Sequence, residues 1–232
     1  MVEWDLQGEA PERAETLPHP SVHMIFERGG KSRIRGPARK KFSTLLEDKG
    51  CVFAVKFTPG GFYPFVGVPV SEFSDRIVTL RDVFGRRGDE LDRVVLAEET
   101  DLSRINLVES FLLARLGDVA EVDENVVKVT EIVYEVAKDR ELLKVQDLVD
   151  RYGLNKRMLQ RLFARYVGVS PKWVIQRYRL NEAAAELATG SAISQSELAQ
   201  NLGYSDQAHF IRDFKSIVGV SPAAYVKAAR QS

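Results

Sequence analysis

The chain has 232 residues, and its 33 basic residues (Lys and Arg) balance 33 acidic ones (Asp and Glu), so its formal net charge is zero. The single cysteine, Cys51, excludes an internal disulfide and the clustered thiolates of a structural zinc site. No apolar run approaches the roughly 18 to 20 residues that cross a bilayer, and the first residues lack the pattern of a secretion signal. These features favour a cytoplasmic protein without a membrane partner, and its length accommodates two domains of moderate size.

The N-terminal part predicts a small β-rich unit. Strand-like runs of β-branched and aromatic residues occupy residues 2–6, 22–26 and 51–57. Gly and Pro pairs between these runs predict turns. From Ser74 onward the apolar spacing becomes helical, with Ile77, Leu80 and Phe84 in the first segment. We expect the helices of this segment to close off the β unit.

An acidic, glycine-containing stretch at residues 117–123 is the expected domain boundary, because everything after it has helical spacing. The predicted fold class is therefore α+β. Residues 1–118 are expected to form the β-rich domain with its closing helices, and residues 119–232 an all-α domain.

A repeat runs through this second part. Residues 165–171 (RYVGVSP) recur as SIVGVSP at residues 216–222, an offset of 51. Upstream, residues 147–153 (DLVDRYG) recur as ELAQNLG at an offset of 50. Each copy predicts a short helix, a turn with Gly, and a second helix ending at Gly, which is the outline of a helix-turn-helix. Between the copies, Ser170 and Pro171 predict the start of a linker helix that runs to about Ala188.

The second helix of each copy has an apolar stripe and an outward face. The stripes comprise Leu159, Leu162, Phe163 and Tyr166 in the first copy, and Phe210, Phe214, Ile217 and Val218 in the second. The outward residues are Lys156, Arg157, Gln160, Arg161 and Arg165 in the first, and Gln207, Ala208, Ile211, Arg212 and Lys215 in the second. Arg and Gln can read base edges, while Lys and Arg can neutralise phosphates, so these residues form the predicted DNA-binding surface. Taken singly, each is also typical of a solvated helix surface.

The distribution of charge supports this interpretation, although the net charge is zero. Eight basic residues and no acidic one lie between Arg151 and Asn181. A solvated helix face normally mixes both signs, so an acid-free run of this length favours a nucleic-acid partner.

Residues 123–230 resemble the paired helix-turn-helix DNA-binding domain of the AraC/XylS family of bacterial transcription regulators. The resemblance rests on both repeats, their separation, and a C-terminal signature that comprises LGYSDQAHF at residues 202–210, RDFK at 212–215, GVSP at 219–222 and Tyr225. It implies base-reading positions at Arg157, Gln160 and Arg161, and at Gln207, Ala208, Ile211 and Arg212. Val226 stands where the family often has an Arg, which removes one expected phosphate contact.

The first domain resembles the N-terminal region of a subset of these regulators, which binds an effector, mediates dimerisation, or does both. The aromatic cluster of Phe57, Phe62, Tyr63 and Phe65 around a Gly-rich turn could line an apolar effector pocket. The alternative, a core corner turned by that loop, suits the same residues. A small-molecule effector, a second copy of the chain and RNA polymerase are therefore the further partners that the resemblance implies, besides an operator in double-stranded DNA.

Neither a metal site nor a cofactor is expected. His19 and His23 could share one face of a strand, but no third ligand accompanies them, so hydrogen-bonded histidines are preferred. Nucleophile, phosphate-loop and dinucleotide motifs are absent, so the chain is not expected to be an enzyme. Two alternatives stay open: a small-molecule-binding enzyme, and a helical protein-interaction adaptor that would show no salt-dependent affinity for DNA.

Overall fold

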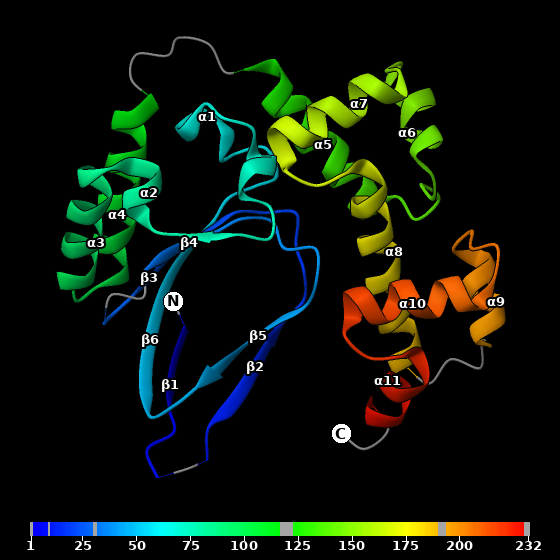
Figure 1. The fold of residues 1–232 in the computed structure, drawn as a ribbon, viewed down its shortest axis with the longest axis horizontal. Helices are drawn as coiled ribbons and strands as arrows, with labels where there is room; N and C mark the ends of the chain where they lie inside the picture. The colour runs from blue at the N-terminus through cyan, green and yellow to red at the C-terminus, as the bar shows by residue number, and fades with distance from the viewer. Residues whose placement is uncertain (1, 9, 30–31, 117–122, 190–193, 230–232) are drawn as a thin grey trace.

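The computed structural model describes residues 2–8, 10–29, 32–116, 123–189 and 194–229, and its strands precede nearly all of its helices (Figure 1). The strands are β1 (Val2–Asp5), β2 (Glu12–Thr16), β3 (His23–Glu27), β4 (Arg33–Arg35), β5 (Phe42–Leu46), β6 (Lys49–Lys56) and β7 (Ile77–Val78). Within the described residues, β1-β6-β3-β4-β7 form one antiparallel sheet in that order, and β2 and β5 form a separate two-stranded ribbon. The α+β class and the β-rich start are confirmed.

The two faces of the main sheet have different neighbours. Met24 and Phe26 on β3 are fully buried, whereas His23 and Ile25, which alternate with them along the strand, are half-buried. His23 pairs with Lys56 on one side and with Arg35 on the other, so these three residues share the less buried face. The Arg35 guanidinium lies 3.7 Å from the ring centre of Phe42, so this face is turned toward the β2–β5 ribbon.

Short helices cover the opposite face, as the apolar spacing predicted. They are α1 (Tyr63–Val66), the 3₁₀ turn η1 (Val70–Phe73), α2 (Leu80–Phe84), α3 (Arg86–Ala97) and α4 (Asp101–Leu116). The helical prediction for Ile77 is wrong: this residue lies in β7 and pairs with Arg35. The helix begins only after Thr79, whose hydroxyl accepts a hydrogen bond from the Asp82 amide while the Asp82 carboxylate accepts one from the Thr79 amide.

The rest of the chain is helical. Its elements are α5 (Glu124–Lys138), α6 (Val145–Tyr152), α7 (Lys156–Leu162), the π-helical turn η2 (Phe163–Val167), α8 (Pro171–Ala188), α9 (Gln195–Asn201), α10 (Gln207–Val218) and α11 (Pro222–Ala229). The linker-helix prediction is confirmed by α8, whose first turn is capped by the Ser170 hydroxyl accepting from the Trp173 amide at 3.2 Å. No helix in the described ranges combines the length and apolar composition needed to cross a membrane.

The buried apolar residues form two clusters that divide within α8. The first runs from Val22 through Phe163 to Ile175, and therefore joins the β unit to the first helical repeat. The second begins at Leu180 and contains Phe210 and Phe214 of the second repeat. The boundary predicted at residues 117–123 falls almost wholly on residues 117–122, outside the described ranges. The apolar core continues across it.

Candidate nucleic-acid interface

The first repeat folds as a helix, a tight turn and a second helix. Gly153 ends α6 in the left-handed conformation with φ 61°, which a residue with a side chain adopts only at a cost in free energy. The Asn155 side chain then accepts a hydrogen bond from the Met158 amide at 2.8 Å and starts α7. The whole stripe predicted from Leu159 to Tyr166 is buried.

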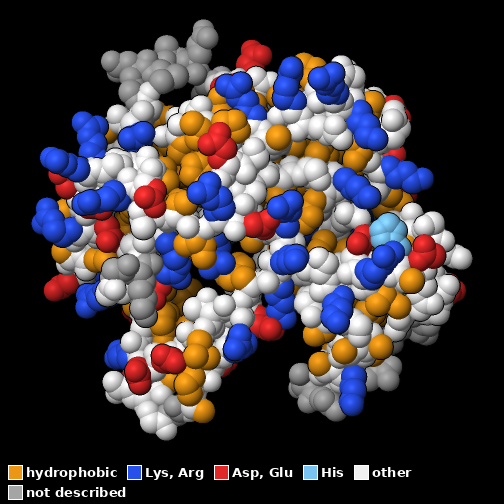
Figure 2. Space-filling view, in the orientation of Figure 1, with side chains coloured by type: hydrophobic (Ala, Val, Ile, Leu, Met, Phe, Trp, Pro, Cys, Tyr) orange, Lys and Arg blue, Asp and Glu red, His pale blue; other side chains and the backbone are white. Residues whose placement is uncertain are grey.

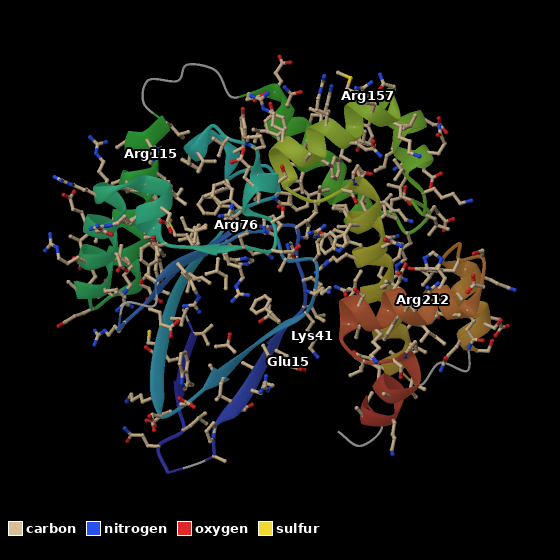
Figure 3. All side chains as sticks on the ribbon, in the orientation of Figure 1. Glu15, Lys41, Arg76, Arg115, Arg157 and Arg212 are labelled. Atoms are coloured by element: carbon tan, nitrogen blue, oxygen red, sulfur yellow. The ribbon has the colours of Figure 1, made fainter. Side chains whose placement is uncertain are left out.

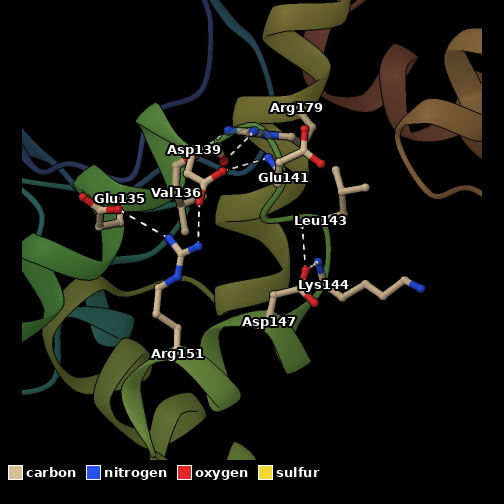
Figure 4. Close-up of polar contacts among 9 residues, drawn as sticks. All are labelled: Glu135, Val136, Asp139, Glu141, Leu143, Lys144, Asp147, Arg151 and Arg179. Carbon is tan, nitrogen blue, oxygen red and sulfur yellow. Dashed lines mark hydrogen bonds and ion pairs between the residues drawn. The ribbon is translucent and has the colours of Figure 1, made fainter.

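Arginines fix this repeat against its neighbours (Figure 4). Arg179 of α8 is 2% exposed and donates to the carbonyl oxygens of Val136 and Asp139 (2.8 Å to Asp139), where α5 ends with unpaired acceptors. Arg151 of α6 pairs with Asp139 at 2.7 Å and with Glu135 at 3.5 Å. The hydrogen bond from Arg151 lowers the pKa of the Asp139 carboxyl. These contacts set the orientation of α6, and therefore of the attached α7, relative to α8.

The outward face of α7 carries free cationic and amide groups. Lys156, Arg157, Gln160 and Arg161 are all exposed, and none of the three cations forms an ion pair with another described residue. Arg157 stands out from α7 in Figure 3. Their exposure and lack of partners leave these groups available to an external anion.

The second helix-turn-helix is built in the same way as the first, with a capping side chain at the start of each helix. Ser194 and Glu197 form a reciprocal cap at the start of α9, and the Asp206 carboxylate accepts from the His209 amide at 2.8 Å to start α10. The predicted stripe from Phe210 to Val218 is buried. The predicted outward residues of α10 differ in exposure. Ile211 is half-buried against the second core, whereas the others are exposed: Gln207, Ala208, Arg212 and Lys215. Ile211 therefore offers less surface to a partner than the sequence pattern indicated.

Arg165 is exposed but, unlike the other predicted residues of the first repeat, its guanidinium is hydrogen-bonded within the protein. Its Nε donates to the hydroxyl of buried Tyr63 at 2.8 Å, its Nη2 donates to the same oxygen, and its guanidinium carbon lies 5.1 Å from the Tyr63 ring centre. The reason is geometric: regular α-helix ends at Leu162, and the π-helical turn that follows changes the angular position of Arg165.

The basic block is likewise divided by the fold. Arg151, Arg165, Arg177 and Arg179 bond to protein groups, and Arg177, at 9% exposure, donates to the carbonyl oxygen of Pro18 at 2.9 Å. Arg151 and Arg165 are exposed although they are bonded, whereas Lys156, Arg157, Arg161 and Lys172 are exposed and have no ion pair with another described residue. Half of the charge that suggested a nucleic-acid partner therefore serves the protein's own structure.

Two lysines extend the surface beyond the residues predicted on α7 and α10. Lys144 precedes α6 and Lys172 lies in the first turn of α8; with Lys156 they line a groove of about 420 Å³ between the repeats. A cation at a helix N-terminus is electrostatically unfavourable, so stability does not explain these three positions. All three lysines lie at helix starts. Once the helices are known, this shared position in the sequence is the feature that could have identified them as surface residues for an anion.

The predicted aromatic pocket is filled. Phe57, Phe62 and Tyr63 are at most 9% exposed, and ring centres lie 5.0 Å apart for Phe57–Phe62 and 5.7 Å apart for Phe57–Phe65. Tyr63 packs on Tyr166 at 4.5 Å. The cluster is a core corner that joins the first domain to the first repeat, because each ring fills the space that a ligand would need.

The histidines are hydrogen-bonded rather than clustered for metal. His19 Nδ1 lies 3.0 Å from the Ser21 hydroxyl, and its Nε2 lies 3.1 Å from Lys56 Nζ. No group of three or more side chains suited to hold a metal ion occurs among the residues that the structure describes.

Two helix-turn-helix units at the ends of one linking helix define a class, the double helix-turn-helix proteins, and comparisons with known proteins agree. Residues 148–228 match the family described as a helix-turn-helix domain, and residues 1–79 match a domain of unknown function (DUF6597). Over 83 residues (36% of this chain) the protein is 35% identical to the HTH-type transcriptional regulator YfiF of Bacillus subtilis, covering 26% of it. It is 34% identical to the transcriptional activator AarP of Providencia stuartii, covering 61%. The chain thus spans less than two thirds of either relative.

Among solved structures, apo ToxT from Vibrio cholerae aligns over 97% of this chain and 95% of its own, with 14% identity and a TM-score of 0.44. Residues 148–228 carry a helix-turn-helix domain like those of YfiF and AarP, and residues 1–79 match a domain of unknown function. These two relatives are described as regulators of transcription.

Proposed function

We propose that this protein regulates transcription by sequence-specific binding to double-stranded DNA, with α7 and α10 in successive major grooves. The observation that carries the proposal is the pair of exposed basic and amide-bearing faces on these two helices, each on a fixed scaffold at one end of α8. With 18 residues, α8 is a rod of about 27 Å, near the roughly 34 Å between successive major grooves on one side of a duplex.

The exposed side chains suggest distinct roles. Arg157, Gln160 and Arg161 would read base edges from the first helix. Gln207 and Arg212 would do so from the second. Ala208 and Ile211 offer only apolar contact, suited to a thymine methyl group or sugar, so the second helix would read fewer bases. The lysines Lys144, Lys156, Lys172 and Lys215 would neutralise phosphates along the backbone between and beside the grooves.

The first domain would modulate this binding through a small-molecule effector, through dimerisation, or through both. Its contacts with the first repeat support the idea, because Tyr63 holds Arg165 and the Ser74 hydroxyl donates to the Gly168 carbonyl at 2.5 Å. A ligand or second subunit that altered these contacts would change how the repeats present their helices. Such a regulator would act in the cytoplasm, with RNA polymerase as a further partner.

The test is selection of binding sites by the full chain from a randomised duplex pool, followed by salt titration of the enriched sequences. We expect two short conserved blocks about one helical turn apart, and an affinity that falls steeply with salt because phosphate contacts release counterions. An enriched pool without any conserved block, or an affinity insensitive to salt, would contradict the proposal and favour the adaptor alternative.

A further inference from the structure

A second cavity lies on the side of the molecule where the β unit meets the helices of the second repeat. It has a volume of about 620 Å³, within the range of small-molecule sites. Its wall includes Arg35, Arg39, Lys40, Lys41, Arg76 and Trp173. Figure 2 shows the molecule hollowed between the strands at lower left and the helices at right, with Lys and Arg side chains around the hollow.

The wall carries an excess of positive charge. Asp75 is the one carboxylate among the described lining residues, and Arg39 already occupies it, with Nε 2.5 Å from Oδ2 and its amide 2.8 Å from Oδ1. Lys41 pairs with Glu15 at 2.5 Å, and both side chains lie at the end of the ribbon nearest α10 (Figure 3). Arg35 and Lys40 have no carboxylate ion-pair partner among the described residues, and Arg76 donates to the Glu72 carbonyl oxygen at 3.0 Å.

Arg35 is the deepest of these cations. Its Nε is buried and has no hydrogen-bond partner in the described part of the chain, and Phe42 covers one face of the guanidinium. Burial, followed by the nearby Arg33 charge, lowers the pKa of Arg35. Its in-register neighbours are His23 and then Lys56, neither of which is acidic. A buried cationic donor without an acceptor is unfavourable, and an oxyanion in the cavity would supply the missing acceptor.

The cavity also offers apolar surface. Phe42 and Trp173 contribute aromatic faces, and Ile77 is 56% exposed on its edge strand. Trp173 belongs to α8, where its indole Nε1 donates to the Arg39 carbonyl at 3.3 Å, and Ser216 of α10 completes the lining. An occupant of this cavity would therefore contact the first domain, the linker helix and the second repeat together.

We propose that this cavity binds a small amphipathic anion, an organic carboxylate or phosphate, with its acidic group on Arg35 and its apolar body against Phe42 and Trp173. The site replaces the filled aromatic cluster as the place for an effector. Control of DNA binding by such a ligand rests on the proposed function above, whereas the binding site itself does not.

The test uses the fluorescent aromatic anion anilinonaphthalene sulfonate as the probe, titrated into the full chain. Naphthoate and naphthyl phosphate then compete as the two kinds of acidic group on one aromatic body, and naphthol competes as the uncharged counterpart. We expect both anions to displace the probe at concentrations at least about tenfold lower than naphthol, because a charge-assisted hydrogen bond distinguishes them. The better competitor identifies the preferred acidic group.

Variants locate the binding site. Arg35→Gln should weaken probe binding about tenfold and Lys40→Gln about threefold, whereas Arg87→Gln, an exposed arginine on α3, should leave it unchanged. Circular dichroism confirms that each variant is folded, and if Arg35→Gln is not, Lys40→Gln combined with Arg76→Gln carries the test at two exposed positions.

Equal probe binding by wild type, Arg35→Gln and Lys40→Gln, or displacement by naphthol as effective as by the anions, overturns the proposal. So does loss of duplex DNA affinity in Lys40→Gln without any effect on the probe, because the cationic wall would then belong to the nucleic-acid surface. A change in operator affinity at saturating naphthoate would link the site to regulation. If the chain bound no DNA at all, the result would contradict the proposed function. The probe titration would still test the ligand site by itself.

Discussion

Arg161 and Arg165 stand one helical turn apart in sequence, and the structure predicts opposite consequences when each is replaced by Ala. Arg161 is exposed on α7 and has no partner in the described part of the protein, so its truncation should leave stability within about 0.5 kcal/mol of wild type. Arg165 is held by Tyr63, so its truncation removes an interdomain contact and should lower the urea midpoint.

The expected loss of DNA affinity is correspondingly different. A good bidentate contact between arginine and a guanine contributes about 1 to 3 kcal/mol of discrimination, which is roughly a 5- to 150-fold rise in Kd for Arg161→Ala. Preference at one base position of the site should relax at the same time. For folded Arg165→Ala protein, Kd should stay within about twofold of wild type, because the side chain points toward the first domain.

The assay is fluorescence anisotropy with a selected duplex and a random duplex of equal length, together with urea unfolding of each variant. Arg161→Ala should lose affinity mainly for the selected duplex. Equal loss on both duplexes would refute its role as a base reader, and a large loss of specific affinity in stably folded Arg165→Ala would refute the assignment of that residue to the domain contact.

Three further predictions follow from the same structure. Lys215→Ala should weaken binding to selected and random duplexes alike and make the salt slope shallower by about 0.9, as one lost phosphate contact requires; an unchanged slope would count against that role. Phe214→Ala, which empties part of the second core, should destabilise it by about 3 to 5 kcal/mol and speed hydrogen exchange in α9 and α10 while α5 stays protected; uniform acceleration would contradict separate cores. Burial, and secondly the Arg177 charge, lower the pKa of His19 from 6.5 to about 3. Between pH 6.5 and about 3 the unfolded chain therefore binds a proton that the folded chain does not. The free energy of unfolding should fall as the pH drops through this range, by at most about 1.4 kcal/mol per pH unit from this group. Urea midpoints measured against pH should show a shallower slope for His19→Gln than for wild type or His209→Gln, and identical slopes would remove His19 as the cause.

Local signals in the sequence were sufficient for the helical half of the fold. Ser170 and Pro171 mark the start of α8 through capping and a fixed backbone angle, and the 3.6-residue spacing of apolar residues identifies the buried stripes of α7 and α10. The same reasoning found β1, β3 and β6, where apolar and β-branched residues dominate. It missed β2, whose sequence ERAET has no apolar alternation. This strand forms through backbone pairing with β5, which local sequence does not reveal.

The site was harder to predict because some of its properties depend on distant contacts. Periodicity put Arg165 on the outer face, but its partner Tyr63 lies 102 residues away in the chain and the π-helical turn lies between regular elements. The cationic cavity depends on the register that aligns Arg35 with His23, and on the approach of Trp173 from α8. Neither the register nor that approach is encoded in local spacing.

We propose above that one rigid linker, α8, holds two recognition helices over successive major grooves. The most direct measurement is the affinity of the full chain for a selected operator before and after insertion of about five base pairs, half a helical turn, between its two blocks. A control duplex changes the intervening bases without changing their number. We expect affinity to fall to the level of a duplex with one block, because α8 cannot follow the second block around the helix. Unchanged affinity after the insertion would contradict this proposal.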